Sequence, residues 1–252
     1  MLGSDPIAAL LGAGIDSRAP QVVWKGYLRR LVAAGAAVVM MAPDVTVPDD
    51  VEGHVLVALA ALLGQYPPGT QMPEETTGRL AGAGHVDAEA ERVNLRVSAY
   101  YRHIDKVLGK ELGSALRDSG VVSVSAGLHV GGSQMVAVVV PDTTALGQWR
   151  DWSAAVSGDR RERHTAPTLL LPGTPGGGVY LFRTADRQVP AGLTIAVGAC
   201  TVSSGDLIVP IPPSRQAGVP VTRLGPCRML PAWLAAAMLQ RQACPAPVAI
   251  AG

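Results

Sequence analysis

Residues 165–183 (TAPTLLLPGTPGGGVYLFR) and 193–215 (LTIAVGACTVSSGDLIVPIPPSR) decide the fold of this chain. They contain apolar or β-branched runs at residues 168–171, 179–183 and 207–211, separated by clusters of Pro and Gly. This pattern predicts β-strands joined by turns, and therefore a sheet. The first turn holds the successive glycines Gly176, Gly177 and Gly178. Because glycine adopts φ > 0 and lets another backbone or a phosphate come close, these glycines are candidate nucleotide or phosphate contacts.

The pieces of this stretch follow one another in a distinctive order. Pro167-Thr168, the glycine turn, Tyr180-Leu181-Phe182 and the sequence VPIPPS at 209–214 are followed by LPAWL at 230–234 and preceded by the apolar run 135–140. In order and spacing they resemble the bifunctional DNA primase/polymerase (prim-pol) domain, the archaeo-eukaryotic primase-like family of phages, plasmids and actinobacterial prophages. The resemblance covers roughly residues 121–235. It implies an α+β core with a mixed or antiparallel sheet flanked by helices. Without it, the same stretch indicates a generic antiparallel sheet.

The resemblance also implies where catalytic residues should lie. Polymerase chemistry needs carboxylates that hold divalent cations between the attacking hydroxyl and the triphosphate. The family's positions fall on Val139 and Pro141 (an Asp-x-Asp pair), Val179 or Tyr180 (a His), Thr201 (a third Asp) and Ser203 (an Arg). None of the expected side chains is present, so we expect a degenerate active site without metal ligands and no cofactor.

Three readings of function remain open. The first is a prim-pol-like protein of a phage or mobile-element DNA replication module that is catalytically degenerate and binds single-stranded DNA, a nucleotide or a replication protein. The second is an active DNA primase/polymerase, a nucleotidyltransferase that uses Asp142 and Asp206 with Mg²⁺ or Mn²⁺. It requires a register slip of one residue, which turns a strand side chain to the opposite face. The third is a structural or assembly protein of a phage.

A charged loop precedes the central strands. Its sequence is DRRERH at residues 159–164, and its arginines Arg160, Arg161 and Arg163 are the candidate phosphate contacts outside the glycine turn. In a compact arrangement we expect them close to that turn. A solvated loop is the alternative.

The chain before residue 121 is expected to be mainly helical. Trp24, Tyr27, Leu28 and Leu31 recur at helical spacing within residues 16–35. A second helix is expected within residues 45–64, and a long one over residues 85–117. In the long helix, basic residues interleave with Tyr100 and Tyr101, which indicates either a stacking surface for a single strand or ordinary core packing. Residues 121–130 and 135–140 are joined by Gly-Gly-Ser, which predicts a hairpin.

Composition limits the classes of protein. The 252 residues carry a net charge of +1, with 48% hydrophobic and 16% charged residues, which favours a globular protein whose contacts with nucleic acid depend on a local patch. Three widely spaced cysteines indicate reduced thiols, and no segment reaches the roughly 20 apolar residues of a membrane span. We expect a cytoplasmic protein with a helical region over residues 1–120, a core over 121–235 and a tail over 236–252.

Overall fold

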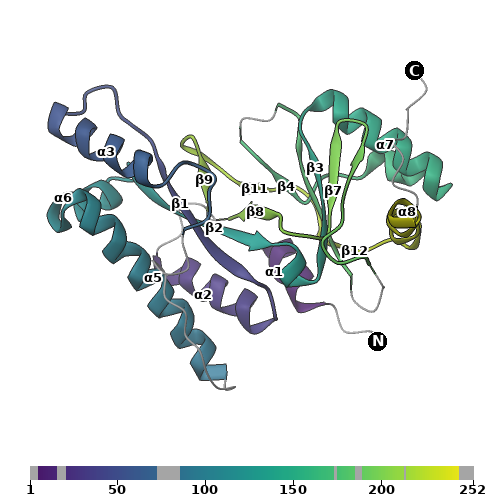
Figure 1. Cartoon of the computed structure of the whole chain (residues 1–252), viewed down its shortest axis with the longest axis horizontal. Coiled ribbons are helices and arrows are strands. Elements are labelled where there is room, and N and C mark those ends of the chain that lie inside the picture. Colours follow the sequence, from purple (N-terminus) through teal and green to yellow (C-terminus); the bar gives the residue numbers. More distant parts are fainter. Residues whose placement is uncertain are drawn as a thin grey trace. The chain divides into compact units, whose positions relative to one another are not determined.

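The structure, a computed structural model, describes residues 5–15, 21–72, 86–172, 175–184, 189–212 and 214–243, and it shows an α+β protein. The chain forms two compact units (Figure 1). The first comprises Met1–Gly14, His129–Val209 and Thr222–Gly252, and the second comprises Ile15–Leu128 and Pro210–Val221. The units thus interleave along the chain and are not consecutive segments.

The first unit is built around one sheet. Its strand order is β11-β4-β5-β3-β7-β6, and β12 also pairs with β5. The strands are β3 (Met135–Val140), β4 (Leu169–Leu170), β5 (Gly178–Arg183), β6 (Thr194–Val197), β7 (Cys200–Ser203), β11 (Thr222–Arg223) and β12 (Arg228–Met229). All neighbouring strands are antiparallel except β12 and β5. Strands β3 and β5 are rich in β-branched and aromatic residues and are buried along almost their whole length, as expected for central strands.

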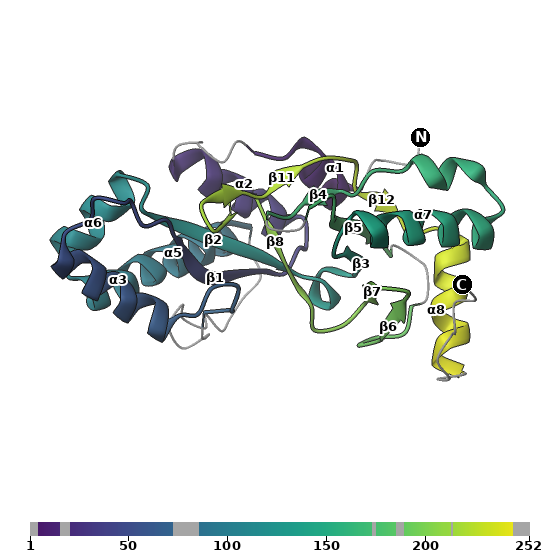
Figure 2. The same cartoon turned by 90° about the horizontal axis from the view of Figure 1, so that it is seen from above.

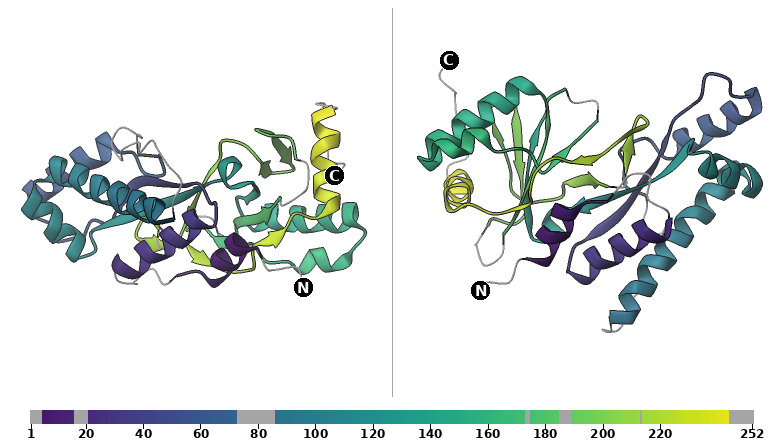
Figure 3. Two further views of the ribbon diagram at one scale, coloured as in Figure 1. Left: turned by 90° about the horizontal axis from the view of Figure 1, so that it is seen from below. Right: turned by 180° about the vertical axis from the view of Figure 1, so that it is seen from behind.

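Two helices cover one face of this sheet. They are α7 (Thr143–Ser157) and α8 (Ala232–Ala243), which lie on the same side of β3 and β7 in Figures 1 and 3. Alternate strand residues such as Val138 and Tyr180 join Trp149 of α7 and Leu234 of α8 in one core. The first unit also contains α1 (Pro6–Ala13) and the short 3₁₀ helices η1 (Gly131–Ser133) and η2 (Arg160–His164).

The second unit packs helices against a small sheet. The helices are α2 (Gln21–Ala33), α3 (Gly53–Gln65), α5 (Val86–Leu108) and α6 (Lys110–Asp118). Strand β1 (Val38–Val45) pairs antiparallel with β2 (Val122–His129), and β8 (Ile208–Ile211) completes the three-stranded order β1-β2-β8. β9 (Arg215–Gln216) and β10 (Val219–Pro220) form a hairpin. Helices α2 and α5 both contact β1 (Figure 2).

The helical pattern near the start of the chain is confirmed. Trp24, Tyr27, Leu28 and Leu31 of α2 are each 6% exposed or less. The expected long helix is divided, because Gly109 adopts φ 84° between α5 and α6, a conformation that interrupts a right-handed helix. Residues 73–84, which separate the expected helices within 45–64 and over 85–117, lie outside the described residues.

Two predictions of strand pairing are wrong. The three runs of the opening stretch are strands, but β8 belongs to the sheet of β1 and β2 and not to that of β4 and β5. The expected hairpin is also absent, since β2 pairs with β1 whereas β3 pairs with β5 and β7. Its connection is η1 followed by Gln134 at φ 52°, and the N–H of Gly131 donates to the carbonyl of Gly205. This turn sends the two strands into different sheets.

Candidate functional site

Three positions at which the prim-pol resemblance expects ligands lie side by side. Val139 of β3 is directly opposite Val179 of β5 on one side and Thr201 of β7 on the other. Their side chains share the face away from α7 and α8, because the adjacent residues Val138 and Tyr180 face those helices. Thr201 is exposed, Val139 is half-buried and Val179 is fully buried. This row supplies no carboxylate and no imidazole.

The other expected positions hold groups with structural partners. The hydroxyl of Tyr180 donates to the carbonyl of Thr165 at 2.9 Å. The hydroxyl of Ser203 lies 3.0 Å from that of Thr194 on the neighbouring strand. Pro141 directly follows β3 and has no polar side chain. The hydroxyl groups of Tyr180 and Ser203 therefore have structural partners within the first unit.

Asp142 acts as the N-cap of α7. Its Oδ1 accepts a hydrogen bond from the N–H of Ala145 at 2.8 Å, and its backbone is extended, with φ −157° and ψ −179°. An N-cap carboxylate satisfies a free N–H group and interacts favourably with the helix dipole. Asp142 thus has a structural role at the end of β3.

Asp206 is paired with a histidine. Its Oδ1 lies 2.8 Å from Nε2 of His129, while Nδ1 of that ring accepts the N–H of Gly132 at 2.8 Å. Because Nδ1 is an acceptor, the ring proton is on Nε2 and is donated to Asp206. The pair borders an open pocket of about 510 Å³ that Gln134 and Pro190 also line. Both ring nitrogens are therefore occupied by partners within the chain.

The two candidate carboxylates lie at opposite ends of the sheet. Strands β3 and β7 run antiparallel, with Ala137 opposite Ser203. Asp142 follows Ala137 toward one end, and Asp206 follows Ser203 toward the other. At about 3.3 Å per residue the eight intervening positions correspond to roughly 25 Å. The structure does not bring Asp142 and Asp206 together.

The glycine turn lies against the chain's own backbone. The hydroxyl of Thr143 donates to the carbonyl of Pro175 at 3.0 Å and ties the turn to the start of α7. A Cβ on any of the three glycines would collide with a neighbour: Gly176 with Thr143 Oγ1, Gly177 with the carbonyl oxygen of Val140 and the backbone of Pro141, and Gly178 with the carbonyl oxygen of Leu169. The approach that requires glycine here is therefore intramolecular.

The arginines of η2 form an exposed basic strip, defined as Arg160, Arg161 and Arg163. Residues three apart in a 3₁₀ helix eclipse one another, so Arg160 and Arg163 lie on the same side. Glu162, between them, is buried. Arg163 forms an ion pair with Asp151 at 3.1 Å, in which both side chains are more than half exposed. Such a pair contributes only about 0–1 kcal/mol, so the guanidinium can still bind an anion.

The basic strip and the glycine turn are separated along α7. Asp151, the partner of Arg163, follows Asp142 by nine positions on the same helix. At about 1.5 Å per residue this is roughly 14 Å along the helix axis. The strip is therefore not close to the glycine turn, and one phosphate cannot contact both.

A partly buried ion pair that sequence reasoning missed holds the strip in place. Glu162 accepts from both terminal nitrogens of Arg228, at 2.5 and 2.9 Å. The hydrogen bond with Glu162 raises the pKa of Arg228, and its guanidinium lies 5.8 Å from the ring centroid of Phe182. The carboxylate of Asp159 caps η2 through the N–H of Arg161. In the sequence, Glu162 is one charge within a charged run, and nothing there indicates its distant partner.

Of the two tyrosines of α5, Tyr100 belongs to the core, whereas Tyr101 is half-buried and its ring is in contact with cations of the same unit. Tyr100 is fully buried, and burial raises its pKa. Tyr101 lies under the cations of Lys25 and Arg117, at 5.9 and 4.9 Å from its ring centroid. A second basic surface in this unit, the α5–α6 line, consists of the exposed residues Arg102, Lys106 and Lys110.

Within the described residues, no group of three or more His, Cys, Asp or Glu side chains is placed to hold a metal ion. None of the described helices combines the length and apolarity needed to cross a membrane. Cys200 and Cys227 are buried free thiols, and Cys244 lies outside the described residues.

Comparison with known proteins gives no relative: no family model matches the chain, and neither a curated protein nor a solved structure shows significant similarity to it.

Proposed function

We propose that this chain is a catalytically degenerate prim-pol-like protein of a phage or mobile-element replication module, and that it binds single-stranded nucleic acid. The observation that carries the proposal is the row Val139, Val179 and Thr201, three expected ligand positions in register on adjacent strands. Two-metal catalysis needs oxygen ligands at such a place. Because Val, Val and Thr supply no carboxylate at these positions, we infer that the protein binds its ligand and does not catalyse the polymerase reaction.

We propose that the basic strip binds the phosphate groups of the single-stranded nucleic acid. Its three guanidinium groups are exposed, while the only acidic residue among them, Glu162, is turned inward to Arg228. Planar guanidinium groups bind phosphate oxygens bidentately, and buried Glu162 fixes the strip to the body of the first unit. Asp151 and Asp159 lower the net charge nearby, so we expect moderate, salt-sensitive affinity.

Catalysis by Asp142 and Asp206 is the runner-up function. It would need the two carboxylates to share cations, whereas one caps α7 and the other binds His129 near the opposite end of the sheet. The separation of roughly 25 Å between Asp142 and Asp206 is also too large for a shift of one residue in strand register to bring the two carboxylates together. A nucleotide-binding or replication-protein-binding role is compatible with the row, and the experiment below separates it from binding of a single strand.

The test combines an activity assay and a binding assay on the full chain. Primer synthesis and extension on single-stranded DNA are measured with Mg²⁺ or Mn²⁺, and fluorescence anisotropy follows binding of the same DNA at several salt concentrations. We expect binding without metal-dependent product. Product that disappears in Asp142→Ala would overturn the degenerate reading, and absence of DNA binding would favour a nucleotide or protein partner.

Matched charge variants locate the binding surface. Joint replacement of Arg160, Arg161 and Arg163 by Ala should weaken binding and reduce the salt slope by about 0.7 per lost phosphate contact. The control replaces Arg102, Lys106 and Lys110 of the α5–α6 line by Ala, which removes the same charge from the other unit. If only the control variant flattens the slope, the α5–α6 line binds the strand and the basic strip does not.

A further inference from the structure

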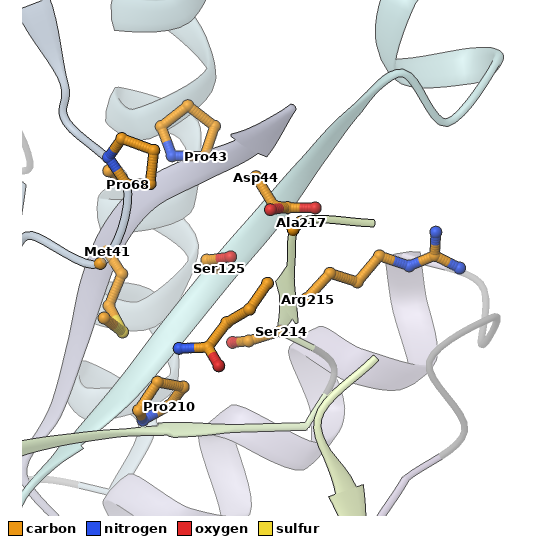
Figure 4. Close-up of a pocket in the computed structure, with 12 residues that line it drawn as sticks. Met41, Pro43, Asp44, Pro68, Ser125, Pro210, Ser214, Arg215 and Ala217 are labelled. Carbon is orange, nitrogen blue, oxygen red and sulfur yellow. The ribbon is translucent and has the colours of Figure 1, made fainter. Parts of the chain in front are cut away.

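A pocket of about 170 Å³ in the second unit carries features that the proposed function does not use. It opens beside β1 and β2, and Figure 4 shows Met41, Pro68 and Pro210 around it together with the polar residues Asp44 and Ser125. Its wall is therefore largely apolar, with a few polar groups, as is usual for sites of small organic ligands.

A β-bulge turns Asp44 toward this pocket. Met41 is opposite Ser125, and Asp44 is opposite Ser123, with the register shift between Met41 and Asp44. Without the bulge, residues three apart on a strand would face opposite sides of the sheet. The extra residue instead places Met41, Asp44 and Ser125 on one face. Bulges commonly re-aim a side chain at a functional site.

The pocket contains polar groups with unused hydrogen-bonding capacity. Asp44 is 7% exposed, and its Oδ2 accepts the N–H of Gly218 at 2.9 Å. Ser125 is 4% exposed, and its hydroxyl has no hydrogen-bond partner among the described residues. Since buried polar groups are normally paired, a hydroxyl of this kind indicates an atom that the protein itself does not supply.

The basic side chain that lines the pocket, Arg215, does not neutralise Asp44. The guanidinium of Arg215 donates to the carbonyl of Gly218 at 3.2 Å, and it is directed away from Asp44 in Figure 4. Across the part of the chain that the structure describes, no side-chain cation forms an ion pair with Asp44. A bound cation would supply that missing charge.

We propose that this pocket binds a small organic cation, a primary ammonium or an amidinium, through Asp44 and Ser125. N–H groups of the ligand donate to the carboxylate and to the serine hydroxyl, and its apolar body packs on Met41, Pro68 and Pro210. At about 30 Å³ per water molecule, the volume corresponds to roughly six waters, which limits the ligand to a single ring or a short chain. A metal ion fits poorly, because hard cations require about six or more oxygen ligands.

The first experiment uses benzamidine and butylamine as probes, with uncharged benzamide as the matched neutral compound. Each is titrated into the ¹⁵N-labelled full chain, and the amide of Gly218 serves as a local reporter because it donates to Asp44. We expect saturable binding of at least one cation, a shift of the Gly218 resonance, and a preference over benzamide of about tenfold or more. Equal binding of benzamide, binding without a Gly218 shift, or binding of neither cation would overturn the proposal.

Variants test the two polar groups separately. Asp44→Asn keeps an acceptor for Gly218 but removes the charge, and it should weaken cation binding about tenfold. Asp49→Asn, an exposed site in the same unit, makes the same charge change and should leave affinity unaltered. Ser125→Ala should weaken binding severalfold and keeps the test valid if Asp44→Asn does not fold. An equal loss in Asp49→Asn, or no loss in either pocket variant, contradicts the assignment.

Discussion

Val139 lies directly opposite Thr201 across the antiparallel strands β3 and β7. Side chains in this relationship have Cβ atoms about 4.5–5.5 Å apart, which is close enough for two carboxylates to share one cation. The pair occupies positions at which the prim-pol resemblance expects acidic residues, and neither residue carries one. We therefore expect that acidic substitutions at these two positions would create a metal site.

The variant Val139→Asp/Thr201→Asp should bind Mn²⁺. Two facing carboxylates repel each other and destabilise the metal-free variant, whereas a cation between them removes the repulsion. Saturating Mn²⁺ should therefore raise the Tm of the double variant by about 2–8 °C, as expected for ligand stabilisation of a protein this size. Differential scanning calorimetry with and without Mn²⁺ measures the change. A double Asn variant is the control, and an equal rise there would refute a carboxylate site.

Gly177→Ala should destabilise the first unit by about 1–3 kcal/mol, the usual cost of overpacking. The added Cβ would lie 2.8 Å from the carbonyl carbon of Pro141 and would collide with the carbonyl oxygen of Val140. Gly147→Ala is the matched control, since nothing lies within 4 Å of its added Cβ and it is in the interior of α7. That variant should gain about 0.5–1 kcal/mol. Urea unfolding measures the free energy of unfolding of both variants. A stabilised Gly177→Ala would show that the turn can accommodate a Cβ at this position.

Features set by local periodicity could be read from the sequence, and features set by distant partners could not. The stripe of α2 follows from a spacing of 3.6 residues, and Trp24 and Leu31 are buried as that spacing predicts. By contrast, the burial of Glu162 depends on Arg228, 66 positions away, and the sequence around Glu162 does not indicate this partner. Strand pairing could not be predicted for the same reason: an apolar run indicates a strand, but it does not indicate which other strand it pairs with.

In the candidate site, too, features set by local sequence can be distinguished from features set by distant contacts. Asp142 was considered from the sequence only as a catalytic carboxylate, although an Asp directly before a helix is a common N-cap residue, which is the role it has in the structure. The direction of Asp44 depends on a bulge in β1, and strand alternation alone does not predict such an insertion. The requirement for glycine at Gly177 was evident, but not that the approaching backbone belongs to Val140 of the same chain.

Cys200 and Cys227 should react slowly with thiol reagents in the folded protein. Burial raises the pKa of Cys200 to about 11 and that of Cys227 to about 12. At pH 8 the reactive thiolate is then about 0.1% of Cys200 or less. Iodoacetamide labelling followed by peptide mass spectrometry reports each cysteine separately. In guanidinium chloride Cys200 should label about a hundredfold faster and Cys227 about a thousandfold faster. Similar native and denatured rates at either residue would mean that its thiol is accessible.

Asp5→Asn should reduce the dependence of stability on acid pH. Burial alone would raise the pKa of Asp5, but the N–H of Ala8 and the guanidinium of Arg183, 2.9 Å away, outweigh it, so the pKa is below its ordinary value of 3.8. The unfolded chain therefore binds more protons than the folded one, and the stabilisation is present above pH 3.8 and is lost as pH falls through the lower folded value. Asn still caps α1, so the variant should lose only the charged contact, about 1–3 kcal/mol at neutral pH. Urea unfolding between pH 2 and pH 7 measures the wild type and the variant, and their curves should converge at the acid end. Parallel curves would show that the Asp5–Arg183 pair does not link folding to this proton.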